Sequence, residues 1–303
     1  MASVELARRP SIGLVQAGVS AAALAGIVWW ASRQHRPHVS LDARSLSELA
    51  GALGLYALAT TLRSERWHRI LVRAGADRGR GESYRLTLVG YMGNNALPAR
   101  AGDLMRVVLL GGARRVVLGT VVAERLLDVA ALAAIFLVVV LSRGLSFGPL
   151  PWVVGAGAVV LAVLALAVWL APRHRLLLAA REWSRPVAAV SRSLVGPAGA
   201  LLLGVSIALW ICEAAVYLVV GSAVGIHLGV VGALYVMALA NLSAVIPAAP
   251  GYVGTYDGAV LLALRSLGKP ALGYLLVLRF VLFVPITVAG FAVFLARYAR
   301  RRG

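Results

Sequence analysis

Cysteine, lysine and acidic residues are scarce in this chain of 303 residues. Cys212 is the only cysteine, which excludes an intrachain disulfide and a metal cluster built from cysteines. Charged residues make up only 14% of the chain, whereas hydrophobic residues make up 60%, and the mean hydropathy is +0.85. This composition excludes an ordinary soluble domain, so we expect an all-α polytopic membrane protein.

Apolar runs long enough to cross a membrane recur along the chain. A hydrocarbon core of about 30 Å takes roughly 20 helical residues. The first run follows two arginines, as in a signal peptide, but its apolar core is too long for one. We expect about six spanning helices, at residues 12–31, 46–62, 117–141, 150–171, 199–223 and 271–296.

Two segments between the spans, residues 83–110 and 228–267, mix apolar and polar residues and contain a similar short sequence motif. Residues 97–103 read Leu-Pro-Ala-Arg-Ala-Gly-Asp, and residues 246–252 read Ile-Pro-Ala-Ala-Pro-Gly-Tyr. Such breaks free backbone groups, which hydrocarbon does not tolerate unless protein or a wet cavity satisfies them. We therefore expect two re-entrant broken-helix hairpins. The alternative is a chance match in a chain rich in alanine and glycine.

Arginines gather in alternate connections between the spans. Seven lie in residues 63–85, five in residues 173–192 and four in residues 297–302. By the positive-inside rule these segments face the cytoplasm, and so do both termini. With three membrane crossings in the first half, an odd number, the second half would begin on the opposite side of the membrane and would have the inverted orientation. We therefore predict a single integral membrane domain over residues 1–303, with inverted halves at approximately 1–145 and 146–303, an arrangement typical of transporters.

Polar residues crowd around the first break. Arg100 and Arg106 suit a phosphate group, because a planar guanidinium donates two parallel hydrogen bonds. The amides of Asn94 and Asn95 add further donors. These residues predict a binding site for an anionic headgroup. Asp103 falls in the first turn of the restarted helix, where the helix dipole favours a carboxylate, and there a capping role is the simpler expectation.

The third span carries Glu124, Arg125 and Asp128. Each charge costs roughly 2.5 to 3.5 kcal/mol at the centre of a membrane helix, so each needs a partner or a function. Arg125 can reach Asp128 three residues on, as a structural ion pair or as part of a site. Glu124 has no local cation. Three arginines elsewhere are candidates, namely Arg100, Arg106 and Arg279.

The second break has no arginine of its own. Its candidate substrate-binding residues are Asn241, Tyr252, Tyr256 and Asp257. Asp257 can pair with Arg279 of the last span, either as a structural bridge or within the site. We expect the first break to hold the headgroup and the second to shape or gate the path.

The remaining ionisable residues give weaker signals. Glu213 lies within the fifth span, where it could carry a proton or serve as a hydrogen-bonded packing residue. His35 and His38 have a His-x-x-His spacing but no carboxylate or cysteine partners. We therefore expect no metal site and no cofactor.

Three segments together resemble a known family. Residues 93–106, 124–128 and 250–257, with Arg66-Trp67, are similar to the flippase-like transmembrane domain of lysylphosphatidylglycerol synthases. The resemblance covers most of the chain and implies a protein that moves a lipid or a lipid-linked precursor between leaflets. The matching polar positions are Arg100, Asp103, Glu124, Arg125, Asp128 and Asp257. The chain differs in having aspartate at 103 and 257, where glutamate is usual, and Tyr252, where glycine is common.

The bifunctional relatives carry a soluble synthase domain after the membrane part, and here the sequence stops soon after the last span. We therefore expect a stand-alone member that is not an enzyme. The leading hypothesis is a lipid translocase for an anionic phospholipid or a lipid-linked or polyprenyl phosphate. The alternatives are a membrane-embedded lipid-modifying enzyme with a carboxylate base, or an accessory subunit of a lipid or glycan synthase.

The expected partners are membrane lipids with anionic headgroups, since basic segments beside spans hold such headgroups more simply than nucleic acid. A homo-oligomer and a partner synthase both stay open. The expected location is the plasma (inner) membrane of a prokaryote.

Overall fold

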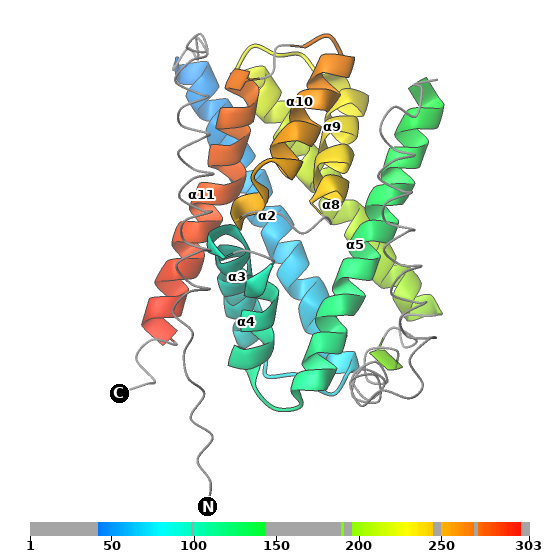
Figure 1. Ribbon diagram of the computed structural model, residues 1–303, viewed down its shortest axis with the longest axis vertical. Coiled ribbons are helices and arrows are strands. Elements are labelled where there is room, and N and C mark those ends of the chain that lie inside the picture. Colours follow the sequence, from blue (N-terminus) through cyan, green and yellow to red (C-terminus); the bar gives the residue numbers. More distant parts are fainter. Residues whose placement is uncertain are drawn as a thin grey trace, which may run out of the picture.

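The computed structural model describes residues 42–97, 100–143, 189–190, 196–244, 250–269 and 272–297, and these residues contain helices and no strand. The helices labelled in Figure 1 have the following bounds: α2 Ala43–Arg73, α3 Arg80–Ala96, α4 Ala101–Leu110, α5 Arg114–Arg143, α8 Pro197–Ala223, α9 Gly229–Ser243, α10 Thr255–Ser266 and α11 Leu272–Arg297. A single 3-10 turn, η1 (Pro250–Tyr252), precedes α10.

Three of these helices are long and apolar enough to cross a membrane. They are Arg114–Ser142, Pro197–Ala223 and Leu272–Arg297, with mean hydropathies of 2.3, 2.1 and 2.3. They match the spans expected at 117–141, 199–223 and 271–296. Large apolar side chains point outward from them, among them Val138 and Val288, as expected for helices in contact with lipid. The polytopic helical class is therefore confirmed.

The number of spans stays a prediction. The runs at 12–31 and 150–171 lie outside the described residues. The run at 46–62 is part of α2, which continues to Arg73. The positive-inside rule predicts that Arg63 and Arg66 face the cytoplasm, but both are buried inside the protein. The helix does not stop where its hydropathy falls, because Trp67 and Leu71 continue its buried face.

Each mixed segment folds into two short helices separated by a break. The first gives α3 and α4, and the second gives α9, η1 and α10. Residues 98–99 and 245–249 lie outside the described residues. Beside each break one residue that is not glycine adopts the left-handed conformation, Arg100 with φ 55° and Tyr252 with φ 57°. This conformation is uncommon for such residues and marks a local interruption of the helix.

Helices α3 and α4 pack with their backbones in direct contact. A Cβ atom at Gly102 would overlap the carbonyl oxygen of Gly90 and the backbone nitrogen of Asn94. A Cβ atom at Gly290 of α11 would likewise overlap the Leu88 carbonyl of α3. Small residues at these crossings allow the close approach that is typical of membrane helix pairs.

The two short helix pairs lie end to end between longer helices (Figure 1). Helix α3 packs against α11, and α9 packs against α5, so each pair contacts a long helix from the other half of the chain. Helices α2 and α8 pack against each other. The main apolar core surrounds α8, α9 and α10, with fully buried residues such as Tyr217, Val236 and Leu264. A smaller core includes Trp67 and lies under α3 and α4.

Candidate functional site

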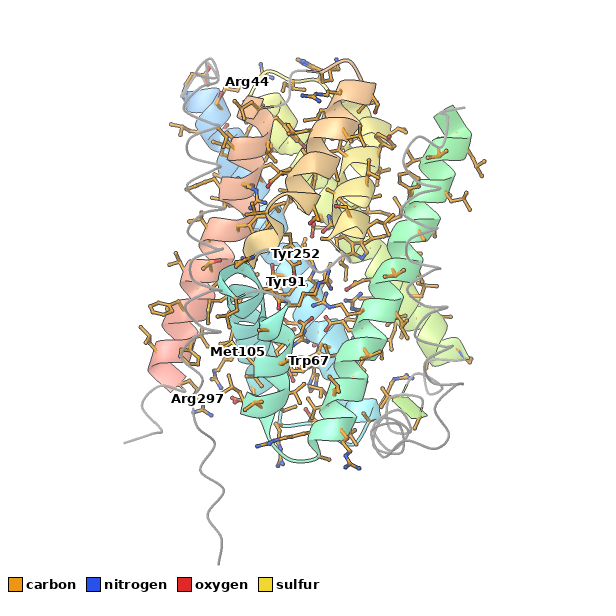
Figure 2. All side chains as sticks on the ribbon, viewed as in Figure 1. Arg44, Trp67, Tyr91, Met105, Tyr252 and Arg297 are labelled. Atoms are coloured by element: carbon orange, nitrogen blue, oxygen red, sulfur yellow. The ribbon has the colours of Figure 1, made fainter. Side chains whose placement is uncertain are left out.

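A cavity of about 130 Å³ lies where the two helix pairs meet. Figure 2 shows Tyr91 and Tyr252 at this level of the molecule, with Trp67 below them. The cavity wall combines arginines, carboxylates, amides and aromatic rings. Its polar and aromatic residues are Tyr56, Arg63, Tyr91, Asn95, Arg100, Arg125, Asp128, Trp210, Glu213, Asn241, Tyr252, Tyr256 and Phe283.

Arg100 reaches from the first break to the second. Its Nη2 donates a hydrogen bond to the carbonyl oxygen of Ala244 at the end of α9. The guanidinium carbon lies 5.3 Å from the ring centroid of Tyr252, within the range of a cation–π contact. The Nε atom is buried and has no hydrogen-bond partner. No carboxylate among the described residues forms an ion pair with Arg100, although this cation lines the cavity.

Arg63 is the second cation of the cavity, and it forms an ion pair with Glu213 of α8. Its guanidinium lies over the ring of Trp210, 4.9 Å from the centroid. The Nδ2 of Asn241 donates to Oε1 of Glu213 at 3.2 Å and to the hydroxyl of Tyr217 at 3.2 Å. Glu213 is therefore held in an ion pair, and its proton-carrying role has no support in these contacts.

Arg125 and Asp128 of α5 form one side of the cavity. Arg125 binds both carboxylate oxygens of Asp103, at 3.1 and 2.9 Å. It also contacts Asp128 at 3.3 Å, the pair expected from the sequence. Asp128 accepts further hydrogen bonds from Arg66 at 2.7 Å and from the indole nitrogen of Trp210 at 3.2 Å. These three donors hold the Asp128 carboxylate in place at the cavity wall.

Glu124 lies behind this wall and is fully buried. Its carboxylate contacts Arg106 at 2.7 Å and Arg66 at 3.3 Å. Arg106 was one of the three expected cations, and Arg66 was not among them. The guanidinium of Arg106 stacks over Trp67, 3.8 Å from the ring centroid, and does not line the cavity. Arg66, Arg106 and Glu124 thus join α2, α4 and α5 behind the site.

Asp103 does not cap its helix with its side chain. The N-cap residue of α4 is Arg100, and that end has no side-chain capping bond. The Asp103 carboxylate instead accepts from Arg125 and from the Nδ2 of Asn94 at 3.1 Å. Asp103 therefore lies in the first turn of α4, as expected from the sequence, but its carboxylate binds side chains of α3 and α5 and not the backbone at the helix end.

Asp257 and Arg279 form the ion pair expected from the sequence. Arg279 also donates to the carbonyl of Gly251 at 3.2 Å, and Asp257 accepts from the backbone nitrogen of Gly254 at 3.1 Å. This pair joins α10 to α11 just as Asp103 and Arg125 join α4 to α5. In both cases the two partners are 22 residues apart.

The structure separates the candidate residues into two groups. The cavity is lined by Asn95, Arg100, Arg125, Asp128, Asn241, Tyr252 and Tyr256. The others lie outside its lining, namely Asn94, Asp103, Arg106, Glu124, Asp257 and Arg279. Most of this second group hold the lining residues or their helices in place by ion pairs and hydrogen bonds.

Sequence reasoning missed several residues of the cavity wall, above all Arg63 and Trp210. A signal for Arg63 was present in α2, where Ala52, Tyr56 and Ala59 recur at helical spacing and are buried. The next position on that face is Arg63. Following this face past the predicted end of the span would have placed the arginine inside.

The comparisons with known proteins agree with the resemblance read from the motifs. A family model described as the lysylphosphatidylglycerol synthase TM region matches residues 14–290. No curated protein and no solved structure matches the chain. With a match over most of its length, the chain belongs to the family of the lysylphosphatidylglycerol synthase TM region.

Proposed function

We propose that this protein is a lipid translocase that moves an anionic phospholipid, or a lipid-linked or polyprenyl phosphate, between membrane leaflets. The observation that carries the proposal is Arg100, a cation of the cavity without a carboxylate partner among the described residues. An uncompensated charge inside a membrane protein is costly, and such charges mark substrate pathways. A guanidinium suits a phosphate group, because its planar fork can donate two parallel hydrogen bonds to the phosphate oxygens.

The other arginines around the cavity do not offer such a site. Arg63, Arg66 and Arg125 each contact a carboxylate, and so does Arg106 behind them. An accessory subunit would use its buried charges as ion pairs only. Arg100 departs from that expectation, and this favours translocation over the accessory role.

The proposed route uses two re-entrant hairpins in inverted halves. The pair α3–α4 would enter from the cytoplasm and the pair α9–α10 from the outside, so that the two breaks meet near the midplane. The matched ion pairs support this arrangement, since the offset that carries Asp103 onto Asp257 also carries Arg125 onto Arg279. The reciprocal packing of α3 on α11 and of α9 on α5 supports it as well.

In such a scaffold, rocking of one half against the other would expose the cavity to each leaflet in turn. The headgroup would bind at Arg100 while the acyl or polyprenyl chains stay in the bilayer. The proposal includes a plasma (inner) membrane location in a prokaryote and cytoplasmic termini.

The test is a translocation assay in proteoliposomes. Fluorescent phosphatidylglycerol is scored by quenching of the outer leaflet. We expect the wild type to move the lipid faster than protein-free liposomes do, and Arg100→Gln to fall to the protein-free rate. Arg265→Gln is the matched control, because it removes an exposed arginine outside the cavity and should keep the wild-type rate.

Two outcomes would contradict the proposal. If the wild type moves neither phosphatidylglycerol nor a polyprenyl phosphate faster than empty liposomes, translocation of anionic lipids is wrong. Recovery of a chemically altered lipid from the liposomes would support the alternative of a lipid-modifying enzyme.

A further inference from the structure

The ionic groups around the cavity can be paired one to one. Arg63 pairs with Glu213, Arg66 with Asp128, Arg106 with Glu124 and Arg125 with Asp103. Arg279 and Asp257 form a further pair on the second break. Within the described residues these charges cancel, and Arg100 alone adds to them. The site therefore carries one net positive charge.

The sequence leaves few further carboxylates that could change this balance. The chain has 12 acidic residues, of which Glu5 and Glu182 lie outside the described residues. The other acidic residues of the described part lie away from the cavity, and Glu48, Glu65, Asp77 and Glu82 contact arginine or histidine side chains.

The size of the cavity limits what it can enclose. Its volume of about 130 Å³ is well below the roughly 300 Å³ at which sites for drug-sized ligands begin. The cavity can therefore hold a small group such as a phosphate, while the rest of a headgroup stays outside. Tyr91 and Tyr252, whose hydroxyls can donate hydrogen bonds, line the cavity together with Arg100.

A second negative charge on the ligand would meet unfavourable surroundings. Asp128 and Glu213 both line the cavity, and their carboxylates are held in place by hydrogen bonds. A singly charged phosphate neutralises the site, whereas a doubly charged one reverses its sign in a medium that screens charge poorly.

We infer that the cavity selects a phosphodiester, which carries one negative charge, over a doubly charged phosphomonoester or a diphosphate. This inference rests on the proposed function and narrows its substrate class. Phospholipids with a diester-linked headgroup satisfy it. Phosphatidic acid and polyprenyl monophosphate or diphosphate do not satisfy it at neutral or higher pH.

The test compares two short-chain lipids on purified wild-type protein in a phosphate-free, uncharged detergent. Dihexanoyl phosphatidylglycerol is the phosphodiester and dihexanoyl phosphatidic acid the phosphomonoester, and both are titrated by calorimetry at pH 8 and pH 5. A phosphomonoester loses its second proton near pH 6, so phosphatidic acid is mostly doubly charged at pH 8 and singly charged at pH 5.

We expect phosphatidylglycerol to bind about tenfold or more tightly than phosphatidic acid at pH 8. At pH 5 the gap should close to about twofold, because the monoester then gains affinity while the diester, whose charge is constant, serves as the pH control. Equal affinities at pH 8, or a gap of the same size at pH 5, would overturn the inference.

A charge variant gives an independent reading. Glu213→Gln removes one negative charge from the cavity, so phosphatidic acid should gain at least about tenfold relative to phosphatidylglycerol at pH 8. Glu65→Gln removes the same charge from a carboxylate outside the cavity lining and should keep the wild-type preference. An unchanged preference in a folded Glu213→Gln protein would count against the inference, and the pH comparison on wild type needs no variant.

The outcomes also separate the inference from the proposed function. If both lipids bind equally and Arg100→Gln abolishes both, the anion site stands and the selection by charge is wrong. If neither lipid binds to the wild type at either pH, both the proposed anion site and the inference are wrong.

Discussion

At the residue scale, several of the buried charged side chains form ion pairs with one another behind the cavity and do not line it. Arg66, Arg106 and Glu124 are fully buried and reach one another from three helices. Only α5, through Arg125 and Asp128, brings this network to the cavity wall. A rigid ionic support of this kind fixes the geometry around Arg100.

Removal of one member of this support should destabilise the protein. Glu124→Gln leaves two buried guanidinium groups with one carboxylate fewer, and breaking a buried ionic group in this way costs about 3 to 5 kcal/mol. The melting temperature in detergent should fall clearly. Glu65→Gln is the matched control, since Glu65 binds arginines at the surface, where an ion pair is worth about 0 to 1 kcal/mol. Similar melting temperatures for the two variants would contradict this reading.

At the element scale, the two broken segments differ in how they are built. Helices α3 and α4 are held in backbone contact at Gly102, whereas α9 and α10 are separated by the extra turn η1. The first break places Arg100 in the cavity, and the second places Tyr252 opposite it. The expectation that the first break binds the headgroup stays a prediction.

The close contact in the first pair should be sensitive to a single methyl group. Gly102→Ala adds a Cβ atom that overlaps the backbone of α3, and overpacking of this kind costs about 1 to 3 kcal/mol. We expect a lower melting temperature and slower lipid movement. Gly258→Ala in α10 is the control, because its Cβ atom meets open space and alanine is the better helix former. Comparable losses in both variants would show that backbone contact is not the cause.

At the scale of the whole molecule, the proposal of two inverted halves makes a prediction about topology. The end of α2 and the start of α3 lie at the lower end of the molecule, and the end of α10 and the start of α11 lie at the upper end (Figure 1). If the halves are inverted in the membrane, these helix ends face opposite sides.

Cysteine labelling tests this topology. In a Cys212→Ala background, Arg78→Cys and Arg265→Cys replace two exposed arginines at opposite ends. A membrane-impermeant maleimide added to intact cells should label position 265 and spare position 78 until the membrane is opened. Labelling of both positions from the same side would exclude the proposed orientation of the halves.

Much of the scaffold followed from local properties of the sequence. The apolar runs that became α5, α8 and α11 were predicted within a few residues of their bounds, because transfer of an apolar helix into lipid depends on its own composition. The two breaks were also predicted, since proline and glycine act on the backbone at their own positions. The end of α2 was missed because a hydropathy pattern treats Arg63 and Arg66 as exposed, whereas distant carboxylates allow them to be buried.

The sequence by itself determined the membrane class, the positions of the breaks and the excess of arginine, because these properties depend on local composition. It also predicted the pair Arg125–Asp128, whose partners are a helical turn apart. Only the tertiary structure decided which arginine of the cavity lacks a carboxylate partner among the described residues. Glu213 reaches Arg63 from another helix, and Asp103 likewise reaches Arg125. Arg100 donates a hydrogen bond to the Ala244 carbonyl and lies over the ring of Tyr252. Charge balance inside a protein is a sum over neighbours in space, and those neighbours are brought together only by the fold.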